Sequence, residues 1–199
     1  MLSPTNGRPR VTISIRQMTT TALMTALTAV SAYLIIPLGP VPATMQSSVV
    51  LTAGALLGSR LGALSQVVYL VMGLIGLPVF AGGRSGPGIV LTPTFGYLIG
   101  FVAAAYLTGL ISEKYRIHSV SSLCGAMLAG LFALMLCGIL YLYINMNVVI
   151  GQETSWSTVF SIGLLPFLPV EGLKIALAVG VVYTLKRHGF TVDRETSRC

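Results

Sequence analysis

Long apolar runs dominate this chain, and short polar or glycine-rich segments separate each run from the next. Of the 199 residues, 54% are hydrophobic and only 9% are charged, and the mean hydropathy is +0.87. A soluble domain carries roughly 25% charged residues, so this surface is too apolar for water. The sequence therefore predicts an all-α integral membrane protein whose apolar runs cross a lipid bilayer.

The apolar runs predict six transmembrane helices, which at roughly 20 residues each would use more than half of the chain. Their expected bounds are 18–36, 44–58, 63–77, 94–111, 122–148 and 169–187. They form one domain over residues 16–187, between a cytoplasmic leader at 1–15 and a cytoplasmic tail at 188–199. The glycine-rich residues 79–93 are expected to form an irregular outer loop, and residues 159–168 a re-entrant or lid-like stretch.

The basic residues define an orientation for these helices, because cytoplasmic flanks carry an excess of Lys and Arg. If both termini are inside, ten of the twelve basic residues fall inside: Arg8, Arg10, Arg16, Arg60, Lys114, Arg116, Lys186, Arg187, Arg194 and Arg198. This scatter of single and paired charges at the ends of apolar runs also argues against nucleic-acid binding, despite a net charge of +7. Only Arg84 and Lys174 are left unexplained.

Glu171 and Lys174 fall in the first turns of the last predicted helix, at its outer end. Their i, i+3 spacing puts them on one helix face. Two interpretations remain open: an ion pair that only neutralises two costly charges, or a ligand site facing a cavity, which is the usual role of ionisable groups at membrane depth. Arg84, in the outer loop, is either solvated or part of a loop that folds over the cavity.

Small residues recur on the first predicted helix, where Ala22 and Ala26 are followed by Ala29. Such a face permits close approach of another helix, either inside the bundle or in a partner chain. Motifs for chemistry are absent from the sequence: there is no phosphate-binding loop with its lysine, and no zinc-protease or serine-hydrolase signature. We therefore predict no catalytic residue and no metal ligand.

Four ordered segments of this chain resemble the BioY family, and the resemblance extends over about residues 17–187. They read LGPVPATMQ at 38–46, AGALLGSRLG at 53–62, GLPVFAGG at 76–83 and PTFGYLIGF at 93–101. The resemblance implies the biotin-specific S component of an energy-coupling factor (ECF) importer in a bacterial plasma membrane. The implied fold is a bundle of six transmembrane helices with an outward-facing pocket beneath loops.

The resemblance also implies roles for individual residues. In the family, an acidic residue and a lysine three positions later contact biotin, and Glu171 and Lys174 match that pattern, with Glu in place of the commoner Asp. Tyr97, Arg84 and Gln46 are further pocket candidates. Ala22 and Ala26 match a face that docks onto the coupling transmembrane subunit, which works with two cytosolic ATPase subunits. A homo-oligomer is also possible.

Biotin has a carboxylate at one end, a urea group at the other and an apolar middle, so its site needs matching groups. We expect Lys174, helped by the helix N-terminus or Arg84, to bind the carboxylate, and Glu171 to accept from the urea N–H groups, although the two ends can be exchanged. Phe80, Tyr97 and Trp156 are candidates to cover the apolar part.

No covalent chemistry follows from these residues, so we predict binding and transport, with biotin as the transported ligand and no cofactor. Two alternatives stay open at this point. One is an S component for another small anionic vitamin. The other is a membrane-embedded transferase that acts on a lipid.

Overall fold

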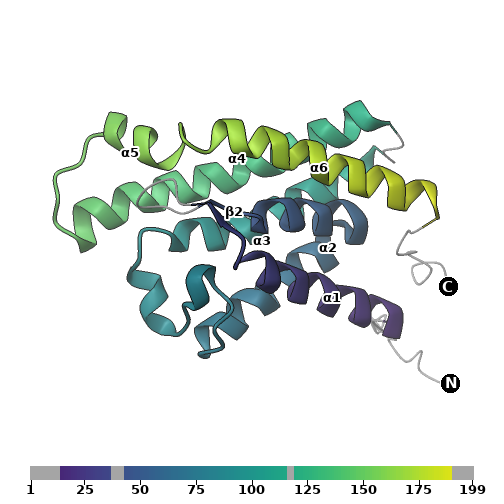
Figure 1. The fold of residues 1–199 in the computed structure, drawn as a ribbon, viewed down its shortest axis with the longest axis horizontal. Coiled ribbons are helices and arrows are strands. Elements are labelled where there is room, and N and C mark those ends of the chain that lie inside the picture. The colour runs from purple at the N-terminus through teal and green to yellow at the C-terminus, as the bar shows by residue number, and fades with distance from the viewer. Residues whose placement is uncertain (1–13, 37–42, 116–118, 190–199) are drawn as a thin grey trace, which may run out of the picture.

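The computed structural model describes residues 14–36, 43–115 and 119–189, which form a bundle of helices (Figure 1). The elements are α1 (Ile15–Ser31), β1 (Ile35–Ile36), β2 (Ala43–Thr44), α2 (Gln46–Leu74), the 3₁₀ turns η1 (Ala81–Gly83) and η2 (Pro87–Leu91), α3 (Phe95–Lys114), α4 (Val120–Ile144), the π-helical turn η3 (Asn145–Val149), α5 (Trp156–Gly163) and α6 (Leu168–Arg187). The predicted leader and tail lie almost entirely outside the described residues.

Helix α1 begins with a capping box and ends earlier than predicted. Ser14 Oγ accepts a hydrogen bond from the Gln17 backbone N–H at 3.2 Å, and Gln17 Oε1 accepts one from the Ser14 N–H at 3.0 Å. The helix ends at Ser31 instead of residue 36, because the isoleucines of β1 pair antiparallel with β2. Hydropathy does not distinguish the two states, since β-branched residues are apolar in a helix and favoured in a strand.

Helix α2 folds back on itself at Gly58, so its two halves correspond to the second and third predicted spans. Gly58 has a φ of 82°, a left-handed conformation that glycine adopts readily. A Cβ on Gly62 would lie only 2.9 Å from the Gly54 Cα. In a straight helix these residues would be about 12 Å apart. The turn predicted at 58–62 is therefore a reversal at Gly58 alone, and the helix restarts at the next residue.

The segment predicted to be lid-like, 159–168, is a short helix followed by a turn. Ser155 caps α5, its Oγ accepting from the Thr158 N–H at 3.4 Å, and the helix ends at Gly163. Pro166 lies in the turn, and Pro169 lies in the first turn of α6, where a missing N–H is tolerated. The prolines thus interrupt the helix where the sequence predicts, but most of the apolar residues before them are helical.

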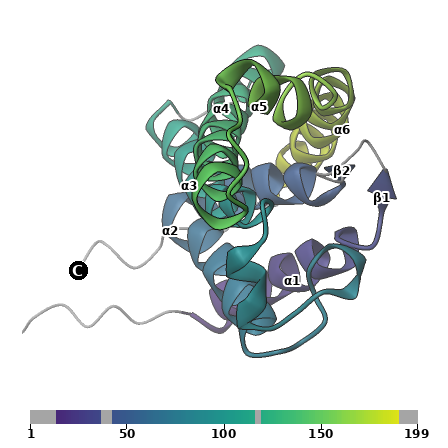
Figure 2. The same cartoon turned by 90° about the vertical axis from the view of Figure 1, so that its left-hand side faces the viewer.

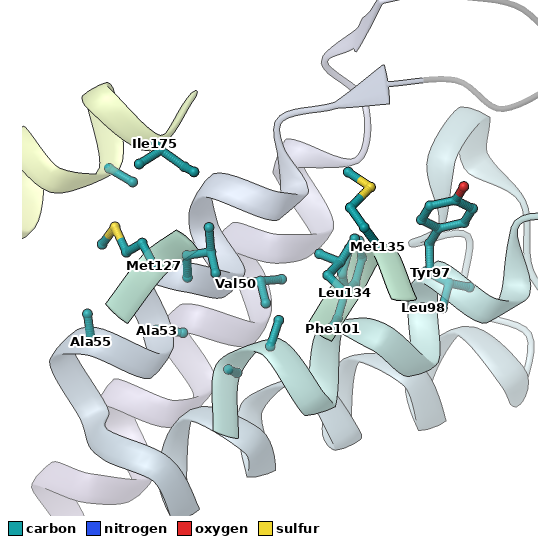
Figure 3. Packing of buried hydrophobic residues seen from close by; sticks show 14 of the residues in the cluster. Val50, Ala53, Ala55, Tyr97, Leu98, Phe101, Met127, Leu134, Met135 and Ile175 are labelled. Atoms are coloured by element: carbon teal, nitrogen blue, oxygen red, sulfur yellow. The ribbon is translucent and has the colours of Figure 1, made fainter. Parts of the chain in front are cut away.

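The hydrophobic core lies among α2, α3, α4 and α6. Figure 3 shows buried side chains from three of these helices near one another: Val50 of α2, Met127 of α4 and Ile175 of α6. Figure 2 shows α2 running between α1 on one side and α6 on the other. Apolar side chains on the outer faces, among them Leu27 and Leu177, stay exposed. That arrangement suits a protein surrounded by lipid.

The first residues of α1 and the last residues of α6 lie at the same end of the bundle (Figure 1). Among the described residues, four helices are long and apolar enough to cross a membrane: α2, α3, α4 with η3, and α6. The shorter helix α1 adds a fifth span, and the division of α2 at Gly58 turns one span into two. The described spans therefore number six, as the sequence predicts. Because a chain that crosses the membrane an even number of times returns to the side on which it began, the start of α1 and the end of α6 lie at the same end of the bundle.

Close backbone contact joins the end of α3 to the bend in α2. The Glu113 carboxylate accepts from the Ser59 N–H at 2.7 Å and from Ser59 Oγ at 3.0 Å, so it satisfies a free donor of the restarted helix. A Cβ on Gly109 would lie 2.3 Å from Ser59 N and 2.4 Å from the Gly58 carbonyl carbon. No side chain fits at Gly109 unless the backbone moves.

We therefore expect Gly109→Ala to destabilise the bundle by about 1 to 3 kcal/mol, which lowers the thermal unfolding midpoint by about 3 °C or more. Thermal unfolding of the purified protein in detergent measures this. The matched control is Gly125→Ala, because a Cβ on Gly125 meets nothing within 4 Å. That midpoint should stay the same or rise, since alanine favours helix. Equal midpoints for the two variants would contradict the described packing.

Candidate functional site

A cavity of about 330 Å³ lies between the loops and helix ends at one end of the bundle. Its walls come from the β1–β2 strands, the start of α2, the η1 loop, the start of α3, the middle of α4 and the start of α6. The lining residues are Ile35, Ala43, Thr44, Gln46, Ser47, Phe80, Ala81, Gly82, Arg84, Ile89, Thr94, Tyr97, Leu98, Phe101, Leu134, Met135, Phe167, Glu171 and Lys174. This is the size of a small-molecule site.

Two opposite charges meet on one wall of this cavity. Lys174 Nζ lies 2.6 Å from Glu171 Oε1, and the two side chains are only 3% and 4% exposed. Ser47 of α2 joins them: its Oγ donates to Glu171 Oε1 at 3.0 Å and accepts from Lys174 Nζ at 3.3 Å. Glu171 Oε2 is also buried but has no hydrogen-bond partner among the described residues. One oxygen of this buried carboxylate thus has no partner among the described residues.

The Gln46 amide is already engaged by its neighbours. Its Oε1 accepts from Thr44 Oγ1 at 2.9 Å, and its Nε2 donates to the Tyr69 hydroxyl. Tyr69 in turn donates to the Val79 carbonyl at 3.0 Å, and the Tyr33 hydroxyl donates to the carbonyl of the preceding residue, Pro78. This chain of bonds fixes the loop after α2 against the start of the same helix.

Phe80 and Arg84 are brought to the cavity by a tight reversal of the loop after α2. The Phe80 N–H donates to the Arg84 carbonyl at 3.1 Å, and Gly82 and Gly83, between them, have φ near 73° and 72°. Phe80 is buried against the edge of Tyr69, with ring centroids 5.5 Å apart. Arg84 remains exposed. No carboxylate of the described residues pairs with it.

Tyr97 lines the cavity from α3 and holds the segment before α6. Its hydroxyl donates to the Gly163 carbonyl at 2.8 Å, and its ring lies 6.4 Å from that of Phe167. The ring also packs on α4 at Gly138, where a Cβ would come within 2.3 Å of it. The aromatic wall therefore depends on a glycine in the facing helix.

All six pocket residues predicted from the sequence line this one cavity: Gln46, Phe80, Arg84, Tyr97, Glu171 and Lys174. Trp156 does not, because it stacks on Tyr143 at 3.9 Å. Ser47 was not predicted, because its only signal is a polar Ser-Ser pair inside an apolar run. Most of the apolar lining was not predicted either, because no sequence feature distinguishes it from ordinary core.

Ala22 and Ala26 both lie on the exposed side of α1, with Leu23 and Leu27. The opposite side of the helix, with Met24 and several threonines, packs against α2. Packing inside the bundle is therefore not the role of the two alanines, and their face is available to another chain.

Comparisons with known proteins agree with this geometry. A model described as the BioY family matches residues 5–189. A probable biotin transporter BioY from Lysinibacillus sphaericus is 44% identical over 71% of this chain and 72% of its own length. The biotin transporter BioY from Rhodobacter capsulatus is 39% identical over 84% of this chain and 89% of its own.

A solved structure has the same fold. It is the crystal structure of the S-component for biotin from an ECF-type ABC transporter, with a TM-score of 0.78 and 29% sequence identity, covering 87% of this chain and 92% of that one. The family model extends over all the described helices. This chain belongs to the BioY family.

Proposed function

We propose that this chain captures biotin in the cavity and delivers it across the membrane as the S component of an ECF-type importer. The observation that carries the proposal is the buried pair of Glu171 and Lys174, both of which line a cavity of about 330 Å³. The names of the relatives support biotin as the ligand, and the likeness to an S component for biotin supports the mode of transport.

The urea group of biotin fits the charged wall. A cyclic urea presents a carbonyl oxygen next to an N–H, and the wall carries the Lys174 ammonium next to the Glu171 carboxylate. The ammonium has three donors, and two of them are used by Glu171 and Ser47. The third can donate to the urea carbonyl while the carboxylate accepts from the N–H. Because the two charges share one wall, they cannot serve opposite ends of an extended ligand.

The carboxylate of biotin then needs another cation. Arg84 lines the same cavity, and none of the described carboxylates pairs with it. We therefore favour the exchanged arrangement, with the urea group at Glu171 and Lys174 and the carboxylate at Arg84. The thioether ring and the alkyl chain of biotin would lie against Tyr97, Phe101 and Phe167, which supply contact area without further polar demands.

Binding without catalysis is part of this proposal, because the polar wall offers complementary hydrogen bonds to a ligand and the relatives are named as transporters. Within residues 14–36, 43–115 and 119–189 no cluster of three metal-binding side chains is present. Equilibrium binding of labelled biotin against a panel of other small anionic vitamins tests the ligand. If another vitamin of the panel binds more tightly than biotin, that vitamin is the ligand of the cavity. If the ligand is chemically altered after incubation with lipid, the chain is a transferase.

Replacing Lys174 by Met keeps most of the side chain but removes the charge. We expect biotin affinity to fall by about 1.5 to 3 kcal/mol, roughly one to two decades, and biotin methyl ester to lose as much, because the ammonium contacts the urea end. Arg84→Met should weaken biotin about fivefold, and the ester much less. Isothermal titration of the purified protein measures all four values.

Lys114→Met is the control for this series, because Lys114 is an exposed basic residue at the other end of α3. Its biotin affinity should match that of the wild type. A Lys174→Met protein that binds the methyl ester as well as the wild type does would reverse the assignment, with Lys174 as the partner of the ligand carboxylate.

The partners of this chain are proposed to be the coupling transmembrane subunit and two cytosolic ATPase subunits of an ECF module. The exposed alanines of α1 support a close helix contact with the coupling subunit, since small residues allow helix backbones to approach in the membrane. The chain itself has no phosphate-binding loop and so depends on separate ATPases. Assembly of several copies is compatible with this arrangement.

Replacing Ala22 or Ala26 with Trp should obstruct that contact. Uptake of biotin by cells and co-purification with the coupling subunit should both fall strongly, whereas biotin binding by the isolated chain should change less than about twofold, since the exposed face is remote from the cavity. Leu23→Trp is the matched control, as Leu23 is already large and lies beside them. If the isolated tryptophan variants lose biotin binding as strongly as they lose uptake, the two alanines maintain the bundle itself.

We further propose that both termini are cytoplasmic in a bacterial plasma membrane. The described basic residues Arg16, Arg60, Lys186 and Arg187 support this orientation, because they flank the ends that would be inside. Reporters inserted after Arg60 and Arg187 should read as cytoplasmic, and one inserted within 82–88 as external. One reproducible reversal would contradict the orientation.

A further inference from the structure

Tyr69 and Gly73 lie one turn apart in the second half of α2, and both contact the loop that follows the helix. Neither residue lines the cavity. The Tyr69 hydroxyl donates to the Val79 carbonyl at 3.0 Å, and its ring meets the Phe80 ring edge-on, with centroids 5.5 Å apart. The Gly73 carbonyl accepts from the Gly86 N–H at 2.8 Å. The loop is thus attached at three points to one face of the helix.

The Phe80 ring contacts Gly73 with its tip. A Cβ on Gly73 would lie 2.0 Å from Phe80 Cζ, and 2.3 and 2.4 Å from the two Cε atoms on either side of it. Phe80 also lines the cavity and is only 1% exposed. An alanine at position 73 therefore requires the ring of a cavity residue to move.

The backbone of Arg84 is tied to that of Phe80. The Arg84 carbonyl accepts from the Phe80 N–H at 3.1 Å, and the Gly83 N–H donates to the Phe80 carbonyl at 2.9 Å. Two residues further on, Gly86 is bound to α2 through Gly73. Arg84 thus lies between two loop residues that α2 holds, and their attachment determines where its side chain begins.

The Tyr69 hydroxyl also joins this loop to the start of α2, because it accepts from the amide of Gln46, another cavity residue. Its ring packs near Phe101, with centroids 6.5 Å apart, as well as against Phe80. Tyr69→Phe removes both hydrogen bonds and keeps the ring. This substitution therefore separates the hydrogen bonding of the residue from its packing.

We propose that Tyr69 is a positioning residue, whose hydroxyl holds the loop so that Arg84 meets the carboxylate of the ligand. This inference rests on the proposed function, in which Arg84 binds the biotin carboxylate. Tyr69 would then contribute to the preference of the cavity for an anionic ligand without touching that ligand. A tyrosine that only stabilised the bundle would support charged and uncharged ligands alike.

The first measurement compares biotin with biotin methyl ester by isothermal titration of the full-length purified protein. For Tyr69→Phe we expect biotin to bind about three- to fivefold more weakly and the ester less than about twofold, because a displaced Arg84 loses only its charged contact. The preference for biotin over the ester should therefore fall. Equal weakening of the two ligands would overturn the positioning role.

A double variant shows whether Tyr69 acts through Arg84. Tyr69→Phe combined with Arg84→Met should bind biotin about as weakly as Arg84→Met alone, since there is no guanidinium left to position. If the two losses multiply instead, the residues act independently and the inference is wrong.

Limited digestion with trypsin follows the loop without any ligand, because trypsin cleaves after Arg84. In Tyr69→Phe the cleavage after Arg84 should become about threefold faster or more, measured against cleavage after Lys114 in the same sample, since a loop with fewer bonds opens more often. Gly73→Ala should act in the same direction through Phe80, and it tests the same attachment if Tyr69→Phe does not fold.

Tyr106→Phe is the matched control, because Tyr106 is an exposed tyrosine of α3 that does not line the cavity. Its ligand preference and its cleavage after Arg84 should equal those of the wild type. If the wild type does not bind biotin, the proposed function fails, and the digestion still decides whether Tyr69 holds the loop. Cleavage that Tyr69→Phe leaves unchanged would overturn the inference even where biotin binds normally.

Discussion

The ion pair between Glu171 and Lys174 constrains the rest of this structure. Removing one partner of a buried pair typically costs about 3 to 5 kcal/mol, because it leaves an uncompensated charge without water. Both charges must therefore stay together and be hydrogen-bonded, which requires the start of α6 to lie against Ser47 at the start of α2. The cavity wall is thus determined by an electrostatic requirement, and the apolar lining packs around it.

The sequence predicted the number of spans, and six residues that line one cavity, better than it predicted the ends of the helices. Glu171, Lys174 and Arg84 stood out because charge at membrane depth, or away from the cytoplasmic flanks, is rare. The end of α1 was wrong because hydropathy is the same for the helical and extended isoleucines that follow it. The re-entrant or lid-like role of residues 159–168 stays a prediction, and the sequence did not show that α5 forms there, because proline marks where a helix is interrupted and not how the residues before it fold.

Other parts of the site could not be found by spacing. Ser47 is a small polar residue, and such residues are common in membrane helices as packing positions. Its role depends on α6, more than a hundred residues away in the chain. Trp156 was expected in the cavity because aromatic rings suit apolar ligands, but its ring stacks on Tyr143 instead. Local sequence gives the chemistry available to a site, whereas tertiary contacts decide which groups take part.

The loop that carries Phe80 and Arg84 is attached to two different helices by consecutive carbonyl groups. Tyr33, just after α1, holds the Pro78 carbonyl, and Tyr69, in the second half of α2, holds that of Val79. A rotation of α1 relative to α2 cannot preserve both bonds unless the loop moves with it. Helix α1 and the cavity are therefore linked through the loop by two hydrogen bonds, so that a displacement of α1 relative to α2 would also shift residues that line the cavity.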